Sequence, residues 1–260
     1  MSSLVYHPLR ARMLQVLRVD DLSPRLRRIT LGGPELEGFT SPMPDDHVKL
    51  LFPAPGEARP VLPTFGANGV SFPDGATRPA ARDYTPRAFD LQRHTLTLDF
   101  VLHGDGPAST WAAAARPGDP IGVAGPRASR VVDPQAHAHW LLLGDETALP
   151  AIARWLEWIP QTSRVTVRVE VDSPEDRIAL PAHDGLDLAW VQRRPVPQGC
   201  ALLAAVCGLP LAPGYAWIAC ESAQMRALRL HLLTERAWPR DHLYAAGYWK
   251  RGTSDHDDEH

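Results

Sequence analysis

The distribution of proline, glycine and apolar residues changes near residue 139, and this change limits the folds that the chain can adopt. Before it, short alternating segments are separated by Pro- and Gly-rich turns, which is typical of antiparallel β structure. After it, short apolar segments alternate with stretches of helical length, which indicates βαβ units around a mostly parallel sheet. With 260 residues, the chain is long enough for both. We therefore expect two domains, residues 1–133 and 134–260.

The N-terminal part predicts an antiparallel β-barrel with one helix. In the clearest strand, residues 94–103, apolar and mainly polar side chains alternate, as in a strand buried on one face. Residues 53–79 are rich in Pro and Gly and predict a long loop. A helix is expected over 109–115, before Pro117 and Gly118. Many short strands favour a closed barrel, and the other expected strands are Met13–Val19, Arg25–Leu31 and His47–Phe52.

The C-terminal part predicts a Rossmann-like domain that binds a nicotinamide nucleotide. Val165, Val167, Val169 and Val171 fall on one face of an expected strand. The polar, acidic tail from about residue 253 is expected to be disordered. The remaining strands are predicted at 140–144, 186–191, 215–220 and 242–246, and the helices at 148–158, 201–206 and 223–237.

Composition excludes several classes of protein. A net charge of −3 gives no general affinity for nucleic acid or an anionic membrane. Cys200, Cys207 and Cys220 form no CxxC pair and have no histidine at zinc spacing, so we expect reduced thiols and no resident metal. The first residues do not resemble a signal peptide, and no apolar run approaches the ~20 residues that span a bilayer. These features predict a soluble cytoplasmic protein.

Two motifs in the N-terminal part predict contacts with a ligand that has both a phosphate and a ring system. Arg82-Asp83-Tyr84-Thr85-Pro86-Arg87 places guanidinium groups beside an aromatic ring, although the same pattern also occurs in ordinary surface strands. FAD is a ligand of this kind. His103-Gly104-Asp105-Gly106-Pro107-Ala108-Ser109 leads from a strand into a helix, whose unpaired amides favour an anion. The alternative is a simple capped turn.

Two further motifs follow strands of the C-terminal part. Gly144-Asp145-Glu146-Thr147-Ala148-Leu149-Pro150 lies at the first βα turn, where dinucleotides bind open α/β sheets. It lacks the Gly-x-Gly-x-x-Gly pattern, and its two carboxylates would repel a pyrophosphate, so it favours a small contact loop. Cys220-Glu221-Ser222 precedes a helix for which Ser222 is the expected N-cap. Gly247-Tyr248-Trp249 ends the last strand and is also compatible with simple packing.

These four motifs, in this order, resemble those of the siderophore-interacting proteins, flavin-dependent ferric-siderophore reductases of the ferredoxin-NADP reductase superfamily. The resemblance extends from about Met13 to Gly252. It implies an N-terminal FAD-binding barrel and a C-terminal NAD(P)H domain. It also implies that NADPH or NADH reduces the flavin, which then reduces Fe(III) in a ferric siderophore and so releases the iron.

The resemblance also implies roles for individual residues. Arg82 would bind the FAD pyrophosphate, Tyr84 would lie against the isoalloxazine, and Thr85 would hydrogen-bond near flavin N5 as the residue closest to the chemistry. The other implied cofactor contacts are Arg87, His103, Gly106, Ala108 and Ser109 in the barrel and Asp145, Glu146, Thr147, Ala148, Glu221 and Trp249 in the second domain. A bulky anionic siderophore would bind a basic set made up of Lys49, Arg127, Arg130, Lys250 and Arg251.

Two alternatives remain open at this stage. Reduced ferredoxin could replace NAD(P)H as the electron donor, because the Gly144 turn is poor in glycine. The protein could also bind a siderophore without reducing it. Cys220 departs from the small residue common in the family, and its role is open.

Overall fold

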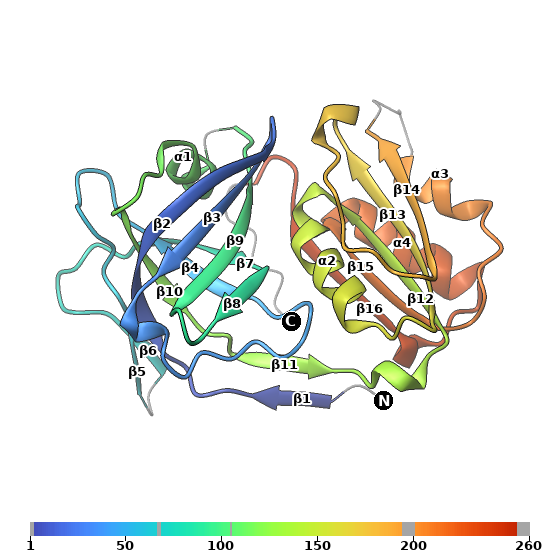
Figure 1. Cartoon of the computed structure of the whole chain (residues 1–260), viewed down its shortest axis with the longest axis horizontal. Helices are drawn as coiled ribbons and strands as arrows, with labels where there is room; N and C mark the ends of the chain where they lie inside the picture. The colour runs from blue at the N-terminus through green and yellow to red at the C-terminus, as the bar shows by residue number, and fades with distance from the viewer. Residues whose placement is uncertain (1–2, 67–68, 105, 194–200, 254–260) are drawn as a thin grey trace. The chain divides into compact units, whose positions relative to one another are not determined.

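The computed structural model of the chain describes residues 3–66, 69–104, 106–193 and 201–253. Asp105, Cys200 and the acidic tail after residue 253 therefore lie outside the described residues. The chain divides into two units, Ser3–Val131 and a second that begins at Val132. Figure 1 shows a curled antiparallel sheet in the first unit and a parallel sheet with helices in the second.

The first unit is built on a seven-stranded antiparallel sheet in the order β7-β4-β10-β2-β3-β9-β8. A second antiparallel pair, β1 with β11, lies beside it. The strands of these two sheets are β1 Ser3–Tyr6, β2 Ala11–Ser23, β3 Leu26–Gly32, β4 Val48–Phe52, β7 Ala80–Tyr84, β8 Ala88–Asp90, β9 Thr95–Val101, β10 Pro120–Ala124 and β11 Ala128–Val131.

The sheet is curled but not closed by hydrogen bonds, which corrects the expectation of a closed barrel. Among the described residues, β7 and β8 form its two unpaired edges. Three residues, Thr85–Arg87, connect these edges, so the chain from Tyr84 to Ala88 spans at most about 14 Å. Pro86 has no N–H for a ladder, and the Arg87 N–H donates to the Thr97 carbonyl at 2.9 Å as β8 begins beside β9. The predicted flavin motif thus crosses the opening of the half-barrel.

Alternation along β9 produces the core of the half-barrel. Leu96, Leu98 and Phe100 are fully buried, as the sequence pattern predicted. The helix α1 (Pro107–Ala114), the one α-helix among the described residues of this unit, packs on the same core through Ala108 and Ala112. The predicted loop over 53–79 contains a short hairpin of β5 (Thr64–Gly66) and β6 (Gly69–Ser71), because Thr64 and Ser71 pair across it. A 3-10 turn, η1 (Pro34–Leu36), follows β3.

The second unit is a five-stranded parallel sheet in the order β14-β13-β12-β15-β16. Its strand order reverses between β12 and β15, which makes the carboxyl ends of these two strands a topological switch point. The elements are β12 His139–Asp145, α2 Leu149–Trp158, β13 Arg164–Val171, β14 Leu186–Gln192, α3 Ala201–Cys207, β15 Tyr215–Glu221, α4 Ser222–Thr234 and β16 Leu243–Trp249. Short 3-10 turns lie at Pro134–Ala136 (η2), Glu146–Ala148 (η3), Pro174–Asp176 (η4) and Arg240–His242 (η5).

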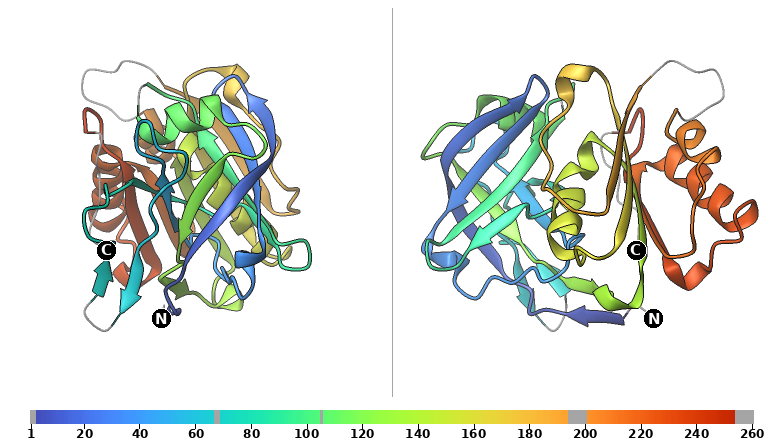
Figure 2. Two further views of the ribbon diagram at one scale, coloured as in Figure 1. Left: turned by 90° about the vertical axis from the view of Figure 1, so that its left-hand side faces the viewer. Right: turned by 45° about the vertical axis from the view of Figure 1, so that its right-hand side comes forward.

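Helices cover both faces of the parallel sheet, with α2 on one side and α3 and α4 on the other (Figure 2). On the α2 side, Trp155 packs against Trp140 with ring centroids 5.6 Å apart. On the other side, Leu141 and Ile218 share a buried cluster with Leu228 of α4. Because both faces are covered, the central strands β12 and β15 are buried along almost their whole length, whereas valine alternates with polar residues along β13.

Candidate functional site

The predicted flavin motif and the predicted helix start meet in the half-barrel. Tyr84 ends β7, and its ring lies 4.4 Å from the ring of Phe100 in β9. Phe100 in turn lies 5.7 Å from Trp111 of α1. This row of three aromatic rings packs the edge strand β7, the strand β9 and the helix α1 together around the core of the half-barrel. The alternating pattern predicted that Phe100 is buried, but it did not predict the contact of Phe100 with Tyr84.

The polar groups of the motif surround this aromatic row. Tyr84 is partly exposed, and burial raises the pKa of its phenol, while the nearby Arg82 opposes that shift. The Arg82 Nη1 donates to the Ala81 carbonyl at 2.6 Å. Thr85 is buried, with 6 % of its surface exposed. Arg87 is partly buried at the start of β8.

The start of α1 retains the features of an anion site. Gly106 is its N-cap and supplies no side-chain cap. The amides of Ala108 and Ser109, in the first turn, have no carbonyl four residues back within the helix. A Cβ at Gly106 would meet nothing within 4 Å, so among the described residues nothing packs against the side of this cap position.

Ser109 has a second role that the sequence did not predict. Its buried hydroxyl accepts the N–H of His103 at 2.8 Å, which holds the end of the β9 segment against the helix start. Together with the partly exposed Tyr84 and the open helix start, this arrangement fits a flat ring joined to a diphosphate. The residues of this part of the half-barrel therefore fit FAD.

The predicted nucleotide contacts of the second unit lie at the switch point, but neighbours already bind most of them. Asp145 ends β12 and is 1 % exposed. Its carboxylate accepts four hydrogen bonds, from Thr147 N at 3.0 Å, Thr147 Oγ1 at 2.5 Å, Glu221 N at 3.1 Å and Trp249 Nε1 at 2.8 Å. Burial and the Glu146 carboxylate together raise the pKa of Asp145 to about 6, although the hydrogen bonds from Thr147 and Trp249 oppose this rise. Asp145 thus joins the ends of three strands.

Glu146 is held by an arginine that the sequence analysis missed. Arg193, just after β14, donates Nη1 and Nη2 to the two carboxylate oxygens of Glu146 at 2.8 and 2.6 Å. Its Nε reaches Glu170 at 2.8 Å, and Nη1 also reaches Asp172 at 2.5 Å. Burial alone would lower the pKa of Arg193, but its bonds to these carboxylates raise it overall. A polar residue directly after an apolar strand was the available signal.

The ends of β15 and β16 correct the expected helix cap. Glu221, not Ser222, is the N-cap of α4, and its carboxylate accepts the N–H groups of Ala223 and Gln224 at 2.7 and 3.1 Å. The Ser222 hydroxyl instead donates to the Trp249 carbonyl at 3.1 Å. Glu221 is the last residue of β15 and directly precedes the first residue of α4, so it occupies the cap position.

Gly144 also has a packing role. A Cβ there would lie 2.4 Å from the Cβ of Ala148 and 2.9 Å from the Ala219 carbonyl. Glycine is therefore needed for the close approach of η3 to β12. Ala148 is fully buried in this contact, and Cys220 is buried in the core under α4.

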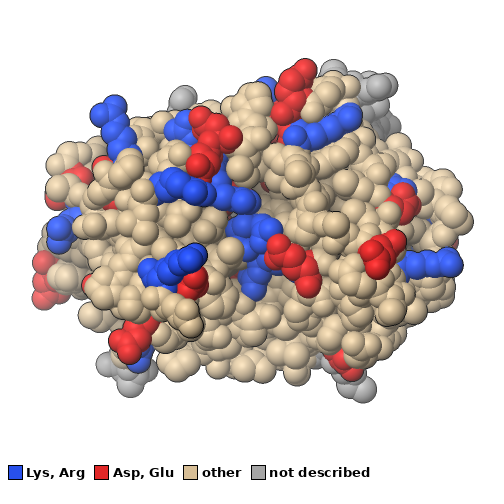
Figure 3. Space-filling model, viewed as in Figure 1, with Lys and Arg blue, Asp and Glu red and all other residues tan. Residues whose placement is uncertain are grey.

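The predicted substrate cations are divided between the two units. Lys49 in β4 lies opposite Asp83 in β7 and forms an ion pair with it at 3.1 Å. Arg127 is exposed after the β10 strand, and Arg130 lies in β11 opposite Leu4. Lys250 and Arg251 are exposed after β16 in the second unit. On the face drawn in Figure 3, basic and acidic side chains are interspersed, in keeping with the small net charge.

Both units match models of known families. Residues 15–130 match the siderophore-interacting FAD-binding domain, and residues 137–252 match the siderophore-interacting protein domain. The chain is 40 % identical to an NADPH-dependent ferric-chelate reductase of Escherichia coli K12, over 94 % of this chain and 95 % of that protein. The chain belongs to the siderophore-interacting protein family. This confirms the family expected from the motifs.

Two other relatives extend over almost the whole chain. The ferric vibriobactin reductase ViuB of Vibrio cholerae is 33 % identical, with 96 % of this chain and 94 % of that protein covered. The crystal structure of a siderophore utilization protein from T. fusca superposes with a TM-score of 0.89 at 37 % identity, covering 99 % of each chain. The predicted order, an antiparallel FAD-binding barrel domain followed by a Rossmann-like parallel-sheet domain, is confirmed, with the barrel sheet curled but not closed. In the part of the chain that the structure describes, no helix combines the length and apolar character needed to cross a membrane.

Proposed function

We propose that this protein is a flavin-dependent reductase that uses NAD(P)H to reduce Fe(III) in ferric siderophores to Fe(II). The observation that carries the proposal is the surface formed by Tyr84, backed by Phe100, beside the open start of α1. Family membership and two relatives named as ferric reductases support it. Oxygen ligands hold Fe(II) less tightly than Fe(III), so reduction releases the iron.

The protein's part in this chemistry is to bind and orient. Arg82 and the amides of Ala108 and Ser109 bind the diphosphate, because cations and helix starts both favour negative charge. Tyr84 supports one face of the ring system, and Thr85 offers a hydroxyl near its reactive edge. When bound, FAD supplies two-electron acceptance from a nicotinamide and one-electron delivery to iron. The remaining barrel contacts that we propose are Arg87, His103 and Gly106.

For the electron donor, we propose NAD(P)H bound at the carboxyl ends of β12, β15 and β16. This is where open α/β sheets bind nucleotides, and one relative is named for NADPH. Asp145, Glu146 and Glu221 act there mainly by shaping the strand ends, since each carboxylate is bound by its neighbours. Thr147, Ala148 and Trp249 complete this set of proposed contacts.

For the substrate, we propose that the cations named above attract an anionic ferric siderophore. Lys49 is held by Asp83 and so projects from a defined position in β4. Arg127 follows Gly125 and Pro126, and its position is fixed by a backbone bond from His7 N to Arg127 O at 2.9 Å. Arg130, Lys250 and Arg251 are the other members of the proposed set.

The deciding experiment is anaerobic stopped-flow spectroscopy of the FAD-loaded protein. NADPH or NADH should bleach the flavin absorbance, and adding a ferric siderophore should restore it while Fe(II) appears with a ferrous chelator. Bleaching by reduced ferredoxin and by neither nicotinamide nucleotide would overturn the proposed donor. If the purified protein takes up no FAD, the proposal of a flavin-dependent reductase is overturned, and a protein that binds a siderophore without reducing it is favoured.

The substrate set has its own test. A Lys49→Ala/Arg127→Ala variant should bind the ferric siderophore more weakly, with flavin content and bleaching by NAD(P)H unchanged. Arg93→Ala is the matched control, since Arg93 is an exposed arginine of the same unit that pairs with Asp90. Unchanged siderophore affinity in the double variant would remove both residues from the proposed site.

A further inference from the structure

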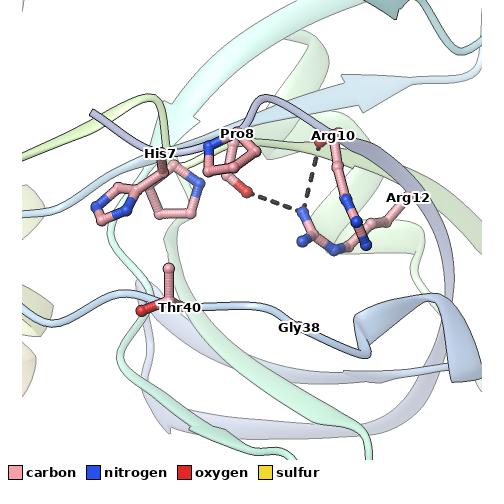
Figure 4. A pocket seen from close by; sticks show the side chains of 8 residues that line it. His7, Pro8, Arg10, Arg12, Gly38 and Thr40 are labelled. Atoms are coloured by element: carbon pink, nitrogen blue, oxygen red, sulfur yellow. Dashed lines mark hydrogen bonds between the residues drawn. The ribbon is translucent and has the colours of Figure 1, made fainter.

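A pocket in the half-barrel lies among residues that no motif singled out. It has a volume of about 120 Å³ and opens between the start of β2, the segment after η1 and the turn after β10. Figure 4 shows two arginines on one side of it and a histidine and a threonine on the other. The lining residues are His7, Pro8, Arg10, Arg12, Gly38, Thr40, Gly125 and Pro126.

Arg12 is a buried cation in this pocket. Only 4 % of its surface is exposed. Its Nε donates to the Glu35 carbonyl at 3.1 Å, and its Nη1 donates to the Gly125 carbonyl at 3.0 Å. These acceptors are neutral, so they satisfy donors without balancing the charge, and a guanidinium with five N–H donors has others left.

A second cation faces the same space. Figure 4 shows the guanidinium of Arg10 beside that of Arg12. Among the described residues, the Arg10 guanidinium has no hydrogen bond or ion pair. Burial lowers the pKa of Arg12, and Arg10 lowers it further, against an opposing effect of Glu35. The Glu35 carboxylate also accepts Met13 N at 2.7 Å. Two adjacent cations at a pocket are stabilised by an anion between them.

The size and the opposite wall of the pocket restrict the anion. The volume equals that of about four water molecules, which suits one tetrahedral oxyanion or one carboxylate group and is too small for a flavin. His7 is fixed by its Nε2 contact with Ser129 Oγ at 2.7 Å. Thr40 lines the same side of the pocket as His7 (Figure 4).

We propose that Arg10 and Arg12 bind an oxyanion group, a phosphate or a carboxylate, in this pocket. The site is independent of the proposed reductase activity, because none of its residues belongs to the flavin, nucleotide or siderophore sets. Its occupation would also steady the turn that leads to Arg127, since Arg12 holds the Gly125 carbonyl of that turn.

The test uses the FAD-loaded full chain, so that the diphosphate site is already filled. Inorganic phosphate and citrate, at ionic strength matched with chloride, are titrated by calorimetry and by melting temperature. We expect saturable binding and a higher melting temperature with at least one of them, and the two titrations distinguish phosphate from carboxylate. Arg10→Gln should weaken binding about tenfold or more, the loss of about 1.4 kcal/mol expected for one charge-assisted contact.

Two controls separate this pocket from other basic residues. Arg93→Gln and Lys49→Ala/Arg127→Ala should keep the wild-type affinity for the anion. Arg10→Glu places a carboxylate beside Arg12, so it should raise the melting temperature in anion-free buffer and abolish the response to phosphate and citrate. Equal anion responses in wild type and Arg10→Gln would overturn the proposal, as would the absence of any saturable binding to the wild-type protein.

Discussion

The two predicted cofactor regions consist of similar turns, each at the end of a strand and the start of a helix, but they treat their polar groups differently. In the half-barrel, the first turn of α1 has no side-chain cap, and a Cβ at its cap residue Gly106 would meet nothing within 4 Å. In the second unit, the cap of α4 is filled by Glu221, and Asp145 accepts four hydrogen bonds. A strand-to-helix turn is therefore ready for a ligand only when its own side chains leave the amides unbound. The first region is organised for binding and the second mainly for holding strand ends together.

The largest expected effect lies in the second region. Arg193→Ala leaves Glu146, Glu170 and Asp172 without their shared cation. Breaking a buried ion pair leaves the remaining charges buried and unpaired. We therefore expect the free energy of unfolding of this unit to fall by about 3–5 kcal/mol. Urea titration of tryptophan fluorescence measures it. Arg164→Ala removes an exposed arginine from β13 and serves as the control. Similar losses in the two variants would contradict the structural role of Arg193.

The next effect concerns the pH dependence set by Asp145. The native state raises the pKa of this carboxyl from 3.8 to about 6, so it binds the proton more tightly than the unfolded chain does. The contribution of Asp145 to the free energy of unfolding must therefore fall by about 3 kcal/mol as the pH rises from about 4 to 6. Above about pH 6 it should stay constant at this lower value.

The readout is the stability of wild type relative to Asp145→Asn, from urea titrations between about pH 4 and pH 7. The free energy of unfolding of the wild type should fall relative to that of Asp145→Asn between about pH 4 and pH 6, and the difference should be constant above about pH 6. Asp184→Asn, at an exposed position of the same unit, should retain the wild-type pH dependence. A flat difference between wild type and Asp145→Asn would show that burial does not raise this pKa.

A smaller effect, on binding rather than stability, is expected in the first region. Arg82→Ala should weaken FAD about 10- to 100-fold, which is the loss of about 1.5–3 kcal/mol typical of a charged hydrogen bond. Fluorescence titration of the flavin-free protein with FAD measures this. Arg82→Lys keeps the charge but loses the planar fork of the guanidinium, so its affinity for FAD should lie between those of the wild type and Arg82→Ala. Wild-type FAD affinity in Arg82→Ala would remove Arg82 from the flavin site.

The smallest effect is expected from Ser109→Ala. The variant keeps the amide of residue 109 but leaves His103 N–H without its acceptor, at a cost of about 1 kcal/mol in stability. FAD affinity should fall by a few-fold at most, because the helix start becomes less well ordered. Thermal melting and flavin titration check both, with the exposed neighbour Thr110→Ala as control. A large loss of FAD with no loss of stability would instead indicate direct contact by the hydroxyl.

Much of the fold could be predicted because it depends on local periodicity. The alternation of Leu96, Leu98 and Phe100 placed β9 and its buried face correctly. The strand predicted over Arg164–Val171, with its valines on one face, is β13 with the same bounds. The prediction of a closed barrel was wrong because closure requires the two edge strands, β7 and β8, to pair with each other. Pro86 lies in the segment between them and has no N–H for such a pairing. Short pairs such as β5 and β6 depend on contacts across the loop that no periodic pattern reports.

The sequence predicted which residue types form the candidate site, but it did not predict the hydrogen-bond and ion-pair partners of these residues. The expected anion site at Gly106–Ser109 coincides with an uncapped helix start, as the motif predicted. Ser222 was wrong as a cap because Glu221 reaches the same amides first. Arg193 and Glu170 were missed because they lie 23 residues apart and meet only when β13 and β14 pair.

The sequence by itself determined the two kinds of sheet, the order of their elements and the family. Each of these follows from local pattern or from short motifs whose meaning does not depend on distant residues. The tertiary structure alone decided which charges are available, because ion pairs and hydrogen bonds join residues remote in the chain. It put Arg193 among three carboxylates and left Arg10 and Arg12 together at a pocket. The difference is physical: periodicity is set by the backbone, whereas electrostatic compensation is set by what the fold brings within a few ångströms.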